Sequence, residues 1–448
     1  SGIFLFVGIF YSKKYQGINN YLVANRSVGT FSLTTSLVAS ALGAWILFGP
    51  ASAATWGGIG AVIGYALGTA FPLFILIYLG KKIRTSYPKG KTLIEIIRIR
   101  LGSNLFKLIL FLSIFYMTIF LIAEVTAVSI LINYISGTDL WITALIVIIC
   151  SISYTLYGGL RASIFTDNIQ FIVLILLLII GFSFLISYNS SDFNIEFIQT
   201  NKSNLLSSNY LPNFTAGLTF FIAVAATNLF HQGNWQRVYA AKSNNVLKKS
   251  LIFSFLIIIP IVFFMGFSGL VAVSQNSSVN PDLAFFFLLL KEQTILLSII
   301  IIVLAISLTI SSIDTLINAI SSLIVVDGNK VIKLRGDYLN LSKQIIILLS
   351  LISFFLASQG LSILYLFLLA DLLCCAAVLT IFFSFYSKSL NEKNSYISII
   401  IGLVAGILLF PSPDFSKSIL TEIASTDSDL RSLNSFPNLR LIRLSLVF

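Results

Sequence analysis

The sequence predicts an all-α protein that crosses a membrane many times. Hydrophobic residues make up 57% of the 448-residue chain, charged residues make up 10%, and the mean hydropathy is +0.97. Soluble domains carry about a quarter charged residues, so this chain lacks the charge to cover a surface that faces water. Uncharged runs such as 171–186 and 252–267 suit membrane helices, which need about 20 residues per crossing. Helices also satisfy their own backbone hydrogen bonds, which lipid cannot do.

The apolar runs divide the chain into about twelve spans. The chain starts inside the first run, so we expect a truncated first helix. We expect one transmembrane domain over residues 1–411 and a polar C-terminal tail over 412–448, which is either a true tail or an artefact such as a translated frameshift. The spans lie near residues 1–11, 30–55, 57–79, 104–135, 139–157, 167–187, 212–232, 248–274, 294–326, 344–358, 361–386 and 395–411.

The net charge of +11 follows membrane topology rather than a nucleic-acid surface. If the loop that holds Lys13, Lys14 and Arg26 is cytoplasmic, the alternate loops are cytoplasmic too, and they carry most of the basic residues. The opposite loops hold only Lys202 and Lys291. This asymmetry is the one that the positive-inside rule describes. We therefore expect a multi-pass protein of the plasma or inner cell membrane that contacts lipid and binds no nucleic acid.

The cysteine and histidine counts argue against an enzyme. Cys150, Cys374 and Cys375 all lie in apolar runs, and His231 is the single histidine. These counts exclude a disulfide framework and a Cys/His zinc site. A Ser–His–acid triad has little support around one histidine. We expect no enzymatic activity, no organic cofactor and no obligate protein partner.

Two spans are interrupted by residues that ordinary lipid-facing helices lack. The segment 36–58 contains Gly43, Gly49 and Pro50, and the segment 220–243 turns polar at Asn228. Five helices separate these spans, and an odd repeat length inverts the second copy. Broken helices at matching places in two inverted halves indicate a binding site at the membrane midplane. The alternative is a Pro/Gly kink in one span and a helix end at the interface in the other.

Four motifs resemble the sodium:solute symporter family, which includes proline, sugar, sialic acid and urea symporters. They are ASALGAWILFGP at 39–50, YGGLRASIFTDNIQF at 157–171, NLFHQGNWQRVYAAKS at 228–243 and ISLTISSIDTLINAISSL at 306–323. The resemblance covers roughly residues 16–410. It implies a leucine-transporter-like ten-helix inverted repeat (5+5) with extra flanking helices. It also implies a sodium-coupled symporter that imports a small polar organic solute by alternating access.

The resemblance further implies a sodium site between the first broken helix and the helix over 306–323. Its members would be Ala39 and Leu42 on the first, with Leu308, Ser311 and Ser312 on the second. Sodium is a hard cation that needs oxygen ligands, which freed carbonyls and hydroxyls supply. The alternative is that the adjacent serines only tighten helix packing.

Acids within the apolar runs suggest a second site. Charges cost about 2.5–3.5 kcal/mol at the membrane centre, so Glu124, Asp314 and Asp371 should face a cavity or a partner. The resemblance places a second cation site at Asp167, Asp314 and Thr315, where an acid replaces a hydroxyl. This site would hold either a second sodium ion or a proton. The alternative is pairing of the acids with Lys or Arg at helix ends.

The solute is the least determined part of the prediction. Ala41 stands where proline-type members carry an acid, and His231 and Gln232 stand where sugar symporters place aromatic rings. An amino acid, a urea-like amide or a carboxylate is therefore expected. Other classes that remain open are a proton-coupled transporter of the same fold and a non-transporting membrane sensor. His231 is alternatively a packing or capping residue at a cytoplasmic helix end. The expected substrate-binding residues are Trp45, Asn228, His231, Gln232 and Asp371.

Overall fold

The described part of the chain is almost entirely helical. The computed structural model describes residues 18–188, 195–207, 209–290, 294–331, 338–387 and 389–420, except for 414, 416 and 419. Within these residues only two isolated β-bridges occur, Val28 with Ala241 and Pro411 with Ser418. The predicted span 1–11 and residues 421–448 of the predicted tail lie outside the described residues.

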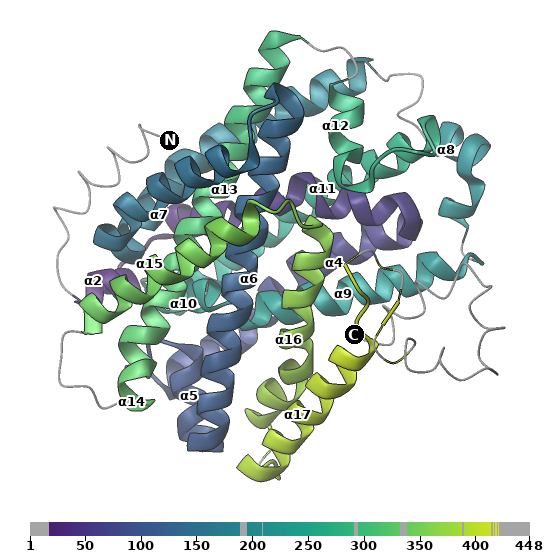
Figure 1. Cartoon of the computed structure of the whole chain (residues 1–448). Helices are drawn as coiled ribbons and strands as arrows, with labels where there is room; N and C mark the ends of the chain where they lie inside the picture. The colour runs from purple at the N-terminus through teal and green to yellow at the C-terminus, as the bar shows by residue number, and fades with distance from the viewer. Residues whose placement is uncertain are drawn as a thin grey trace.

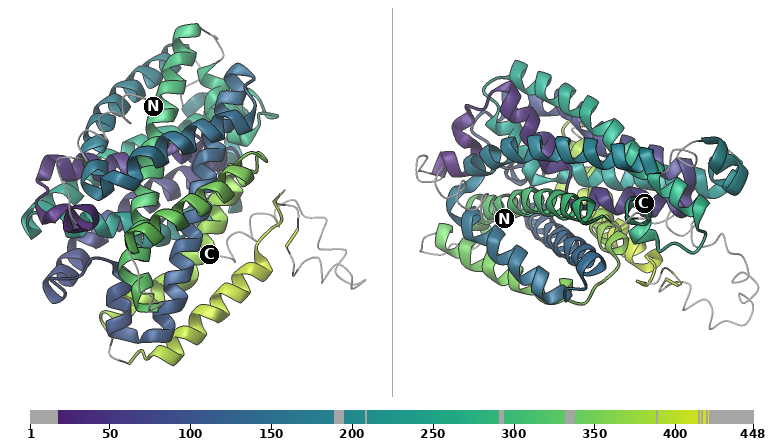
Figure 2. Two further views of the ribbon diagram at one scale, coloured as in Figure 1. Left: turned by 60° about the vertical axis from the view of Figure 1, so that its left-hand side comes forward. Right: turned by 90° about the horizontal axis from the view of Figure 1, so that it is seen from above.

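The helices pack as a bundle in which segments far apart in sequence lie together (Figures 1 and 2). Nine of the described segments are long and apolar enough to cross a membrane. The helices are α2 (Ile18–Val23), α3 (Thr30–Ala41), α4 (Gly49–Ser86), α5 (Leu93–Leu101), α6 (Ser103–Ser136), α7 (Leu140–Tyr188), α8 (Ile195–Lys202), α9 (Leu211–Phe230), α10 (Gln232–Ala240), α11 (Asn244–Gln275), α12 (Ala284–Leu289), α13 (Ile295–Leu323), α14 (Asn329–Val331), α15 (Tyr338–Ala357), α16 (Ile363–Ser384) and α17 (Glu392–Leu409).

Two sharp kinks lie inside continuous helical stretches. One kink is at Gly58 in α4, with φ 59° and ψ −155°, and the other is at Gly159 in α7, with φ 57° and ψ −165°. Only glycine adopts this conformation without strain. A Cβ atom would also collide with Asn213 at the first kink and with Tyr21 at the second. The expected loop between residues 157 and 167 is therefore wrong: this segment is helical.

Small residues bring α4 against α9 and α11. Gly60, Gly64 and Gly68 are spaced four residues apart on α4 and face the backbone of α9 at residues 213–221. On the other side, Gly269 of α11 lies against the backbone of Ala51. Such small residues let membrane helices approach closely. The close packing places the start of α4 beside the middle of the bundle, where the two broken helices meet.

Side-chain caps and basic residues fix the helix ends. Thr92 is the N-cap of α5 and accepts a hydrogen bond from the Glu95 N–H, while the Glu95 side chain accepts one from the Lys91 N–H. Arg84, near the end of α4, donates to the carbonyls of Val238 and Ala241 at the end of α10. Cations are favourable at helix C-termini. The ends of α4 and α10 thus lie together at the face that the sequence assigns to the cytoplasm.

Candidate functional site

The first broken helix stops at Leu42 and resumes at Gly49. The last α-helical hydrogen bond before the break runs from the Leu42 N–H to the Val38 carbonyl (3.0 Å). Gly43 is extended, and residues 44–47 form a short 3-10 turn, η2 (Ala44–Leu47). The last carbonyls of a helix have no partner within it. The break therefore frees carbonyls of the last turn of α3, where Ala39 and Leu42 lie.

α13 lies against this break and brings its paired serines to it. A Cβ atom on Gly43 would meet the Ser312 Oγ and the Glu124 Oε1 atoms, so both oxygens lie next to the break. Ser312 is buried, and its hydroxyl has no hydrogen-bond partner among the described residues. Leu308 is also buried on α13. A buried polar atom without a partner is costly, and here it lies where freed carbonyls are available. The donor set is all oxygen and fits a hard cation such as sodium.

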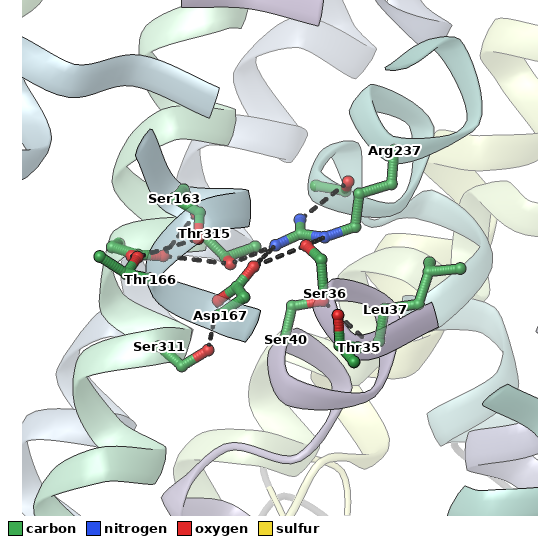
Figure 3. A network of polar contacts seen from close by, with 12 residues as sticks. Thr35, Ser36, Leu37, Ser40, Ser163, Thr166, Asp167, Arg237, Ser311 and Thr315 are labelled. Atoms are coloured by element: carbon green, nitrogen blue, oxygen red, sulfur yellow. Dashed lines mark hydrogen bonds and ion pairs between the residues drawn. The ribbon is translucent and has the colours of Figure 1, made fainter. Parts of the chain in front are cut away.

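Ser311 makes a different contact from its neighbour. Its hydroxyl donates to Asp167 Oδ1 (2.8 Å), and Asp167 Oδ2 accepts from the Ser36 hydroxyl (2.6 Å). Figure 3 shows this network, in which side chains of α3, α7, α10 and α13 converge. Ser311 therefore connects the predicted sodium site to Asp167 on α7.

Arg237 of α10 completes the network with a buried ion pair. Its Nη2 atom lies 2.8 Å from Asp167 Oδ2 and donates to the Thr315 hydroxyl (3.0 Å). Its Nε atom donates to Ser36 (2.7 Å), and the Arg237 and Asp167 side chains are both 0% exposed. The guanidinium thus lies between two of the three residues predicted for a second cation site (Figure 3).

Asp314, the third of those residues, is also engaged. The Ser163 hydroxyl donates to Asp314 Oδ1 (2.9 Å), and the hydroxyls of Thr166 and Thr315 lie 3.4 Å from its carboxylate oxygens. Both sides of the α7–α13 interface are therefore polar at this level of the bundle. The structure brings Asp167, Asp314 and Thr315 together around Arg237.

The second break is a single residue, His231, between α9 and α10. Its backbone leaves the helix with φ −59° and ψ 110°, and its Nδ1 atom accepts a hydrogen bond from the Gly233 N–H (3.2 Å). His231 thus caps α10 at the break while its side chain also lines the cavity described next. The two interruptions predicted from the sequence are confirmed.

A small cavity lies between the two breaks and is lined by residues of both broken helices. Of the predicted substrate-binding residues, Trp45, Asn228, His231 and Asp371 line it. Gln232 does not: its side chain accepts from the Leu93 N–H (3.2 Å) and lies 3.3 Å from the Ser322 hydroxyl, near the start of α5.

Other lining residues were not assigned to the solute site from the sequence. Glu124 of α6, which its place in an apolar run predicted to face a cavity or a partner, lines the cavity and reaches the first break, where its Oε2 atom accepts from the Ala44 N–H (2.8 Å). Tyr65, Phe120 and Phe367 also line the cavity, but nothing in the sequence distinguishes them among 39 phenylalanines and 17 tyrosines.

Arg237 was not among the residues predicted for the site. Its side chain is fully buried in the bundle. The signal that could have found it is its place in the polar segment that follows the break at His231.

Two broken helices that face a buried cavity inside a bundle of membrane-spanning helices define a solute transporter. The chain is a multi-pass membrane protein, and it is a transporter rather than an enzyme. It belongs to the sodium:solute symporter family, whose sequence model matches residues 21–402.

Comparisons with curated proteins give several relatives. A spermidine transporter of Candida albicans is 27% identical over 386 residues, which cover 84% of this chain and 72% of the relative. The sheep sodium/glucose cotransporter 1 is 29% identical over 37% of this chain and 26% of the relative. A high-affinity proline transporter of Bacillus subtilis is 30% identical over 39% of this chain and 38% of the relative. The last two matches thus span less than half of those relatives.

Solved structures confirm the fold. A sodium-coupled sialic acid symporter matches with a TM-score of 0.73 at 17% identity, over 100% of this chain and 94% of that one. A transporter of the nucleobase-cation-symport-1 family matches with a TM-score of 0.59 at 14% identity, over 96% of this chain and 94% of that one. The expected leucine-transporter-like architecture is confirmed.

Proposed function

We propose that this transporter imports a small polar solute by coupling it to sodium. The observation that carries the proposal is the Ser312 hydroxyl, which is buried beside the first break and has no partner among the described residues. Sodium would bind there between the carbonyls of Ala39 and Leu42 and the Ser312 hydroxyl. Leu308 and Ser311 would complete the site from α13.

The mechanism would be alternating access around the two breaks. The proposed sodium site would lie at the break of α3, and the cavity proposed for the solute is lined by residues next to that break and by His231 at the break after α9. An ion that binds at the first break would stabilise one arrangement of α3 against α13 and so order the cavity. Two ligands that favour the same conformation are positively coupled, and the coupling is reciprocal.

We propose that no second cation binds at the site predicted from Asp167, Asp314 and Thr315, because Arg237 already supplies a positive charge there. Arg237 places its positive charge between Asp167 and Thr315, within hydrogen-bond distance of both. A guanidinium at this point would repel a further cation at short range. Sodium at the first break would then be the single coupling ion. Proton coupling is the second candidate, because Glu124 and Asp371 are buried carboxylates that line the cavity.

Uptake into proteoliposomes tests the proposal. The purified protein would be assayed with spermidine, proline, glucose, urea and pyruvate under an inward sodium gradient, under choline at the same pH, and under a pH gradient alone. We expect sodium to drive uptake of one solute class. Equal uptake in choline with a pH gradient would establish proton coupling. No uptake of any of these solutes under any gradient would favour a sensor instead.

Ser312→Ala tests the assignment of the ion site. Because one oxygen ligand is lost, we expect the sodium concentration for half-maximal uptake to rise by about 10- to 100-fold. The solute requirement in saturating sodium should change much less. Ser307→Ala is the matched control, since Ser307 is buried on the same helix but does not line the cavity. If both variants have the same sodium requirement as the natural protein, Ser312 is not a sodium ligand.

A further inference from the structure

Among the described residues, the cavity between the breaks is lined by acids and by no basic side chain other than His231. Two carboxylates, Glu124 and Asp371, line it, and no lysine or arginine does. The single histidine there is neutral, because its Nδ1 atom accepts a hydrogen bond from the Gly233 N–H and so holds no proton. The electrostatic character of the cavity is therefore set by the two acids.

Neither acid has a basic partner in the part of the chain that the structure describes. Among the described residues, the ion pairs are Asp167 with Arg237, and Lys330 with Glu95 and Asp327. Glu124 and Asp371 are nevertheless almost fully buried, at 1% and 3% exposure. Buried carboxylates are costly unless a cation or hydrogen bonds compensate them. The missing compensation points to a positively charged ligand.

Hydrogen bonds anchor both carboxylates: one hydroxyl for Asp371, and the backbone N–H groups of Ala44 and Trp45 for Glu124. The Thr227 hydroxyl donates to Asp371 Oδ1 (2.6 Å), and the Ala44 N–H donates to Glu124 Oε2 (2.8 Å). These hydrogen bonds fix the direction of each carboxylate group, and because a carboxylate has about four acceptor sites, each group can still accept from a ligand. The acids come from α6 and α16, which pack against each other (Figure 1).

Aromatic rings form the other walls of the cavity. Trp45 stacks on Tyr65 with ring centroids 5.9 Å apart, and Phe120 lies 5.2 Å from Phe367. All four line the cavity together with the acids. Aromatic faces attract ammonium groups, and aromatic boxes with nearby acids are a recurring way to bind them. The rings also provide apolar surface for an alkyl chain.

We propose that the transported solute is an organic cation, namely an alkylamine that carries no carboxylate. Its ammonium group would lie against Asp371 and the aromatic faces. In a diamine or longer polyamine, a second ammonium group would approach Glu124. An anionic solute would be repelled by both acids, and a neutral sugar or amide would leave their charges uncompensated. This inference rests on the proposed transport function and narrows its substrate class.

Binding to the purified protein in sodium tests the charge requirement without any substitution. Radiolabelled putrescine and spermidine are the probes. Unlabelled proline, urea, glucose, pyruvate and N-acetylputrescine are the competitors, the last being an amine with one charge removed. We expect both probes to bind and only amines to compete, with N-acetylputrescine weaker than putrescine. Competition by a neutral or anionic solute as strong as that by putrescine would overturn the inference, as would no binding of either probe.

Variants at Asp371 test the site itself. Asp371→Asn should weaken putrescine binding by about 10- to 100-fold, because a charge-assisted hydrogen bond is lost. Asp371→Glu, which keeps the charge, should restore most of the affinity and serves as the test that the protein is folded. Asp139→Asn is the matched control, since Asp139 is an exposed carboxylate before α7. If Asp371→Asn binds putrescine as well as the control does, the assigned site is wrong.

The two proposals fail in different ways. Sodium-driven uptake of proline, urea or glucose with no amine binding would overturn the organic-cation inference and leave sodium-coupled transport intact. Amine binding and uptake that are independent of sodium would overturn the coupling and leave the inference intact.

Discussion

Removing one partner of the buried ion pair should destabilise the protein strongly. Arg237→Met leaves Asp167 buried with no counter-charge, and Asp167→Asn does the same to Arg237. Breaking a buried pair by removing one partner costs about 3–5 kcal/mol. The hydroxyls of Ser36 and Ser311 would still contact Asp167 and offset a part of this cost. We therefore expect each single variant to lose about 3 kcal/mol of unfolding free energy or more.

The double variant distinguishes a charge effect from a packing effect. Arg237→Met with Asp167→Asn removes both charges, so neither is left unpaired. It should be more stable than either single variant, with a coupling energy of about 2 kcal/mol, within the range found for residues in one network. Unfolding can be followed by circular dichroism as sodium dodecyl sulfate is titrated into detergent-solubilised protein.

Glu95→Gln is the control for a partly exposed ion pair. Glu95 pairs with Lys330 at 2.9 Å, and their side chains are 26% and 22% exposed. Exposed pairs contribute about 0–1 kcal/mol, so this variant should be nearly as stable as the natural protein. The network does not act as a unit if the losses of unfolding free energy of the two single variants simply add in the double variant. The same holds if neither single variant loses more unfolding free energy than Glu95→Gln.

Three further variants examine the breaks. Gly43→Ala puts a methyl group against the Ser312 Oγ and Glu124 Oε1 atoms, so sodium-dependent uptake should be lost while the protein remains folded by circular dichroism. Glu124→Gln keeps the acceptor for the Ala44 N–H but removes a charge, so amine affinity should fall with little change in melting temperature; an unchanged affinity would limit Glu124 to anchoring the break. His231→Asn retains a good N-cap for α10 but loses the ring, so stability should persist while solute affinity falls by about 5- to 100-fold. Unchanged solute affinity would mean that His231 only caps α10 and does not contact the solute.

The membrane fold was predictable because its main determinants are local in sequence. Apolar runs, Gly43 and Pro50 in one helix and the polar segment after Asn228 in another indicate spans and breaks without knowledge of packing. The segment 157–166 misled the prediction because its polar residues look like a loop. In the structure Ser163 and Thr166 form hydrogen bonds with Asp314 across a helix interface. These polar side chains therefore face the protein interior and not solvent.

The site was less predictable because its members meet through tertiary packing. A buried arginine and a cytoplasmic one look the same in a hydropathy profile, and the partner of Arg237 lies 70 residues away. The aromatic walls pair Trp45 with Tyr65 and Phe120 with Phe367, and no local pattern marks such pairs. Gln232 has a side chain that could bind a polar solute and lies next to the second break. It does not line the cavity, because it lies on the side of α10 that faces α5.

Glu124 connects the proposed ion site to the proposed solute site. Position 41 of the first broken helix is alanine, where the resemblance to proline-type symporters would place an acid, and in this structure Glu124 reaches the same break from α6. One of its oxygens accepts from the Ala44 N–H, and the other lies beside Gly43 and Ser312. A cation at the break and an ammonium group in the cavity would both interact with this one carboxylate. Binding of either cation would therefore change the position of the Glu124 carboxylate and the charge available to the other cation. A shared acid of this kind gives the two sites a direct physical means of coupling, in addition to any movement of the helices.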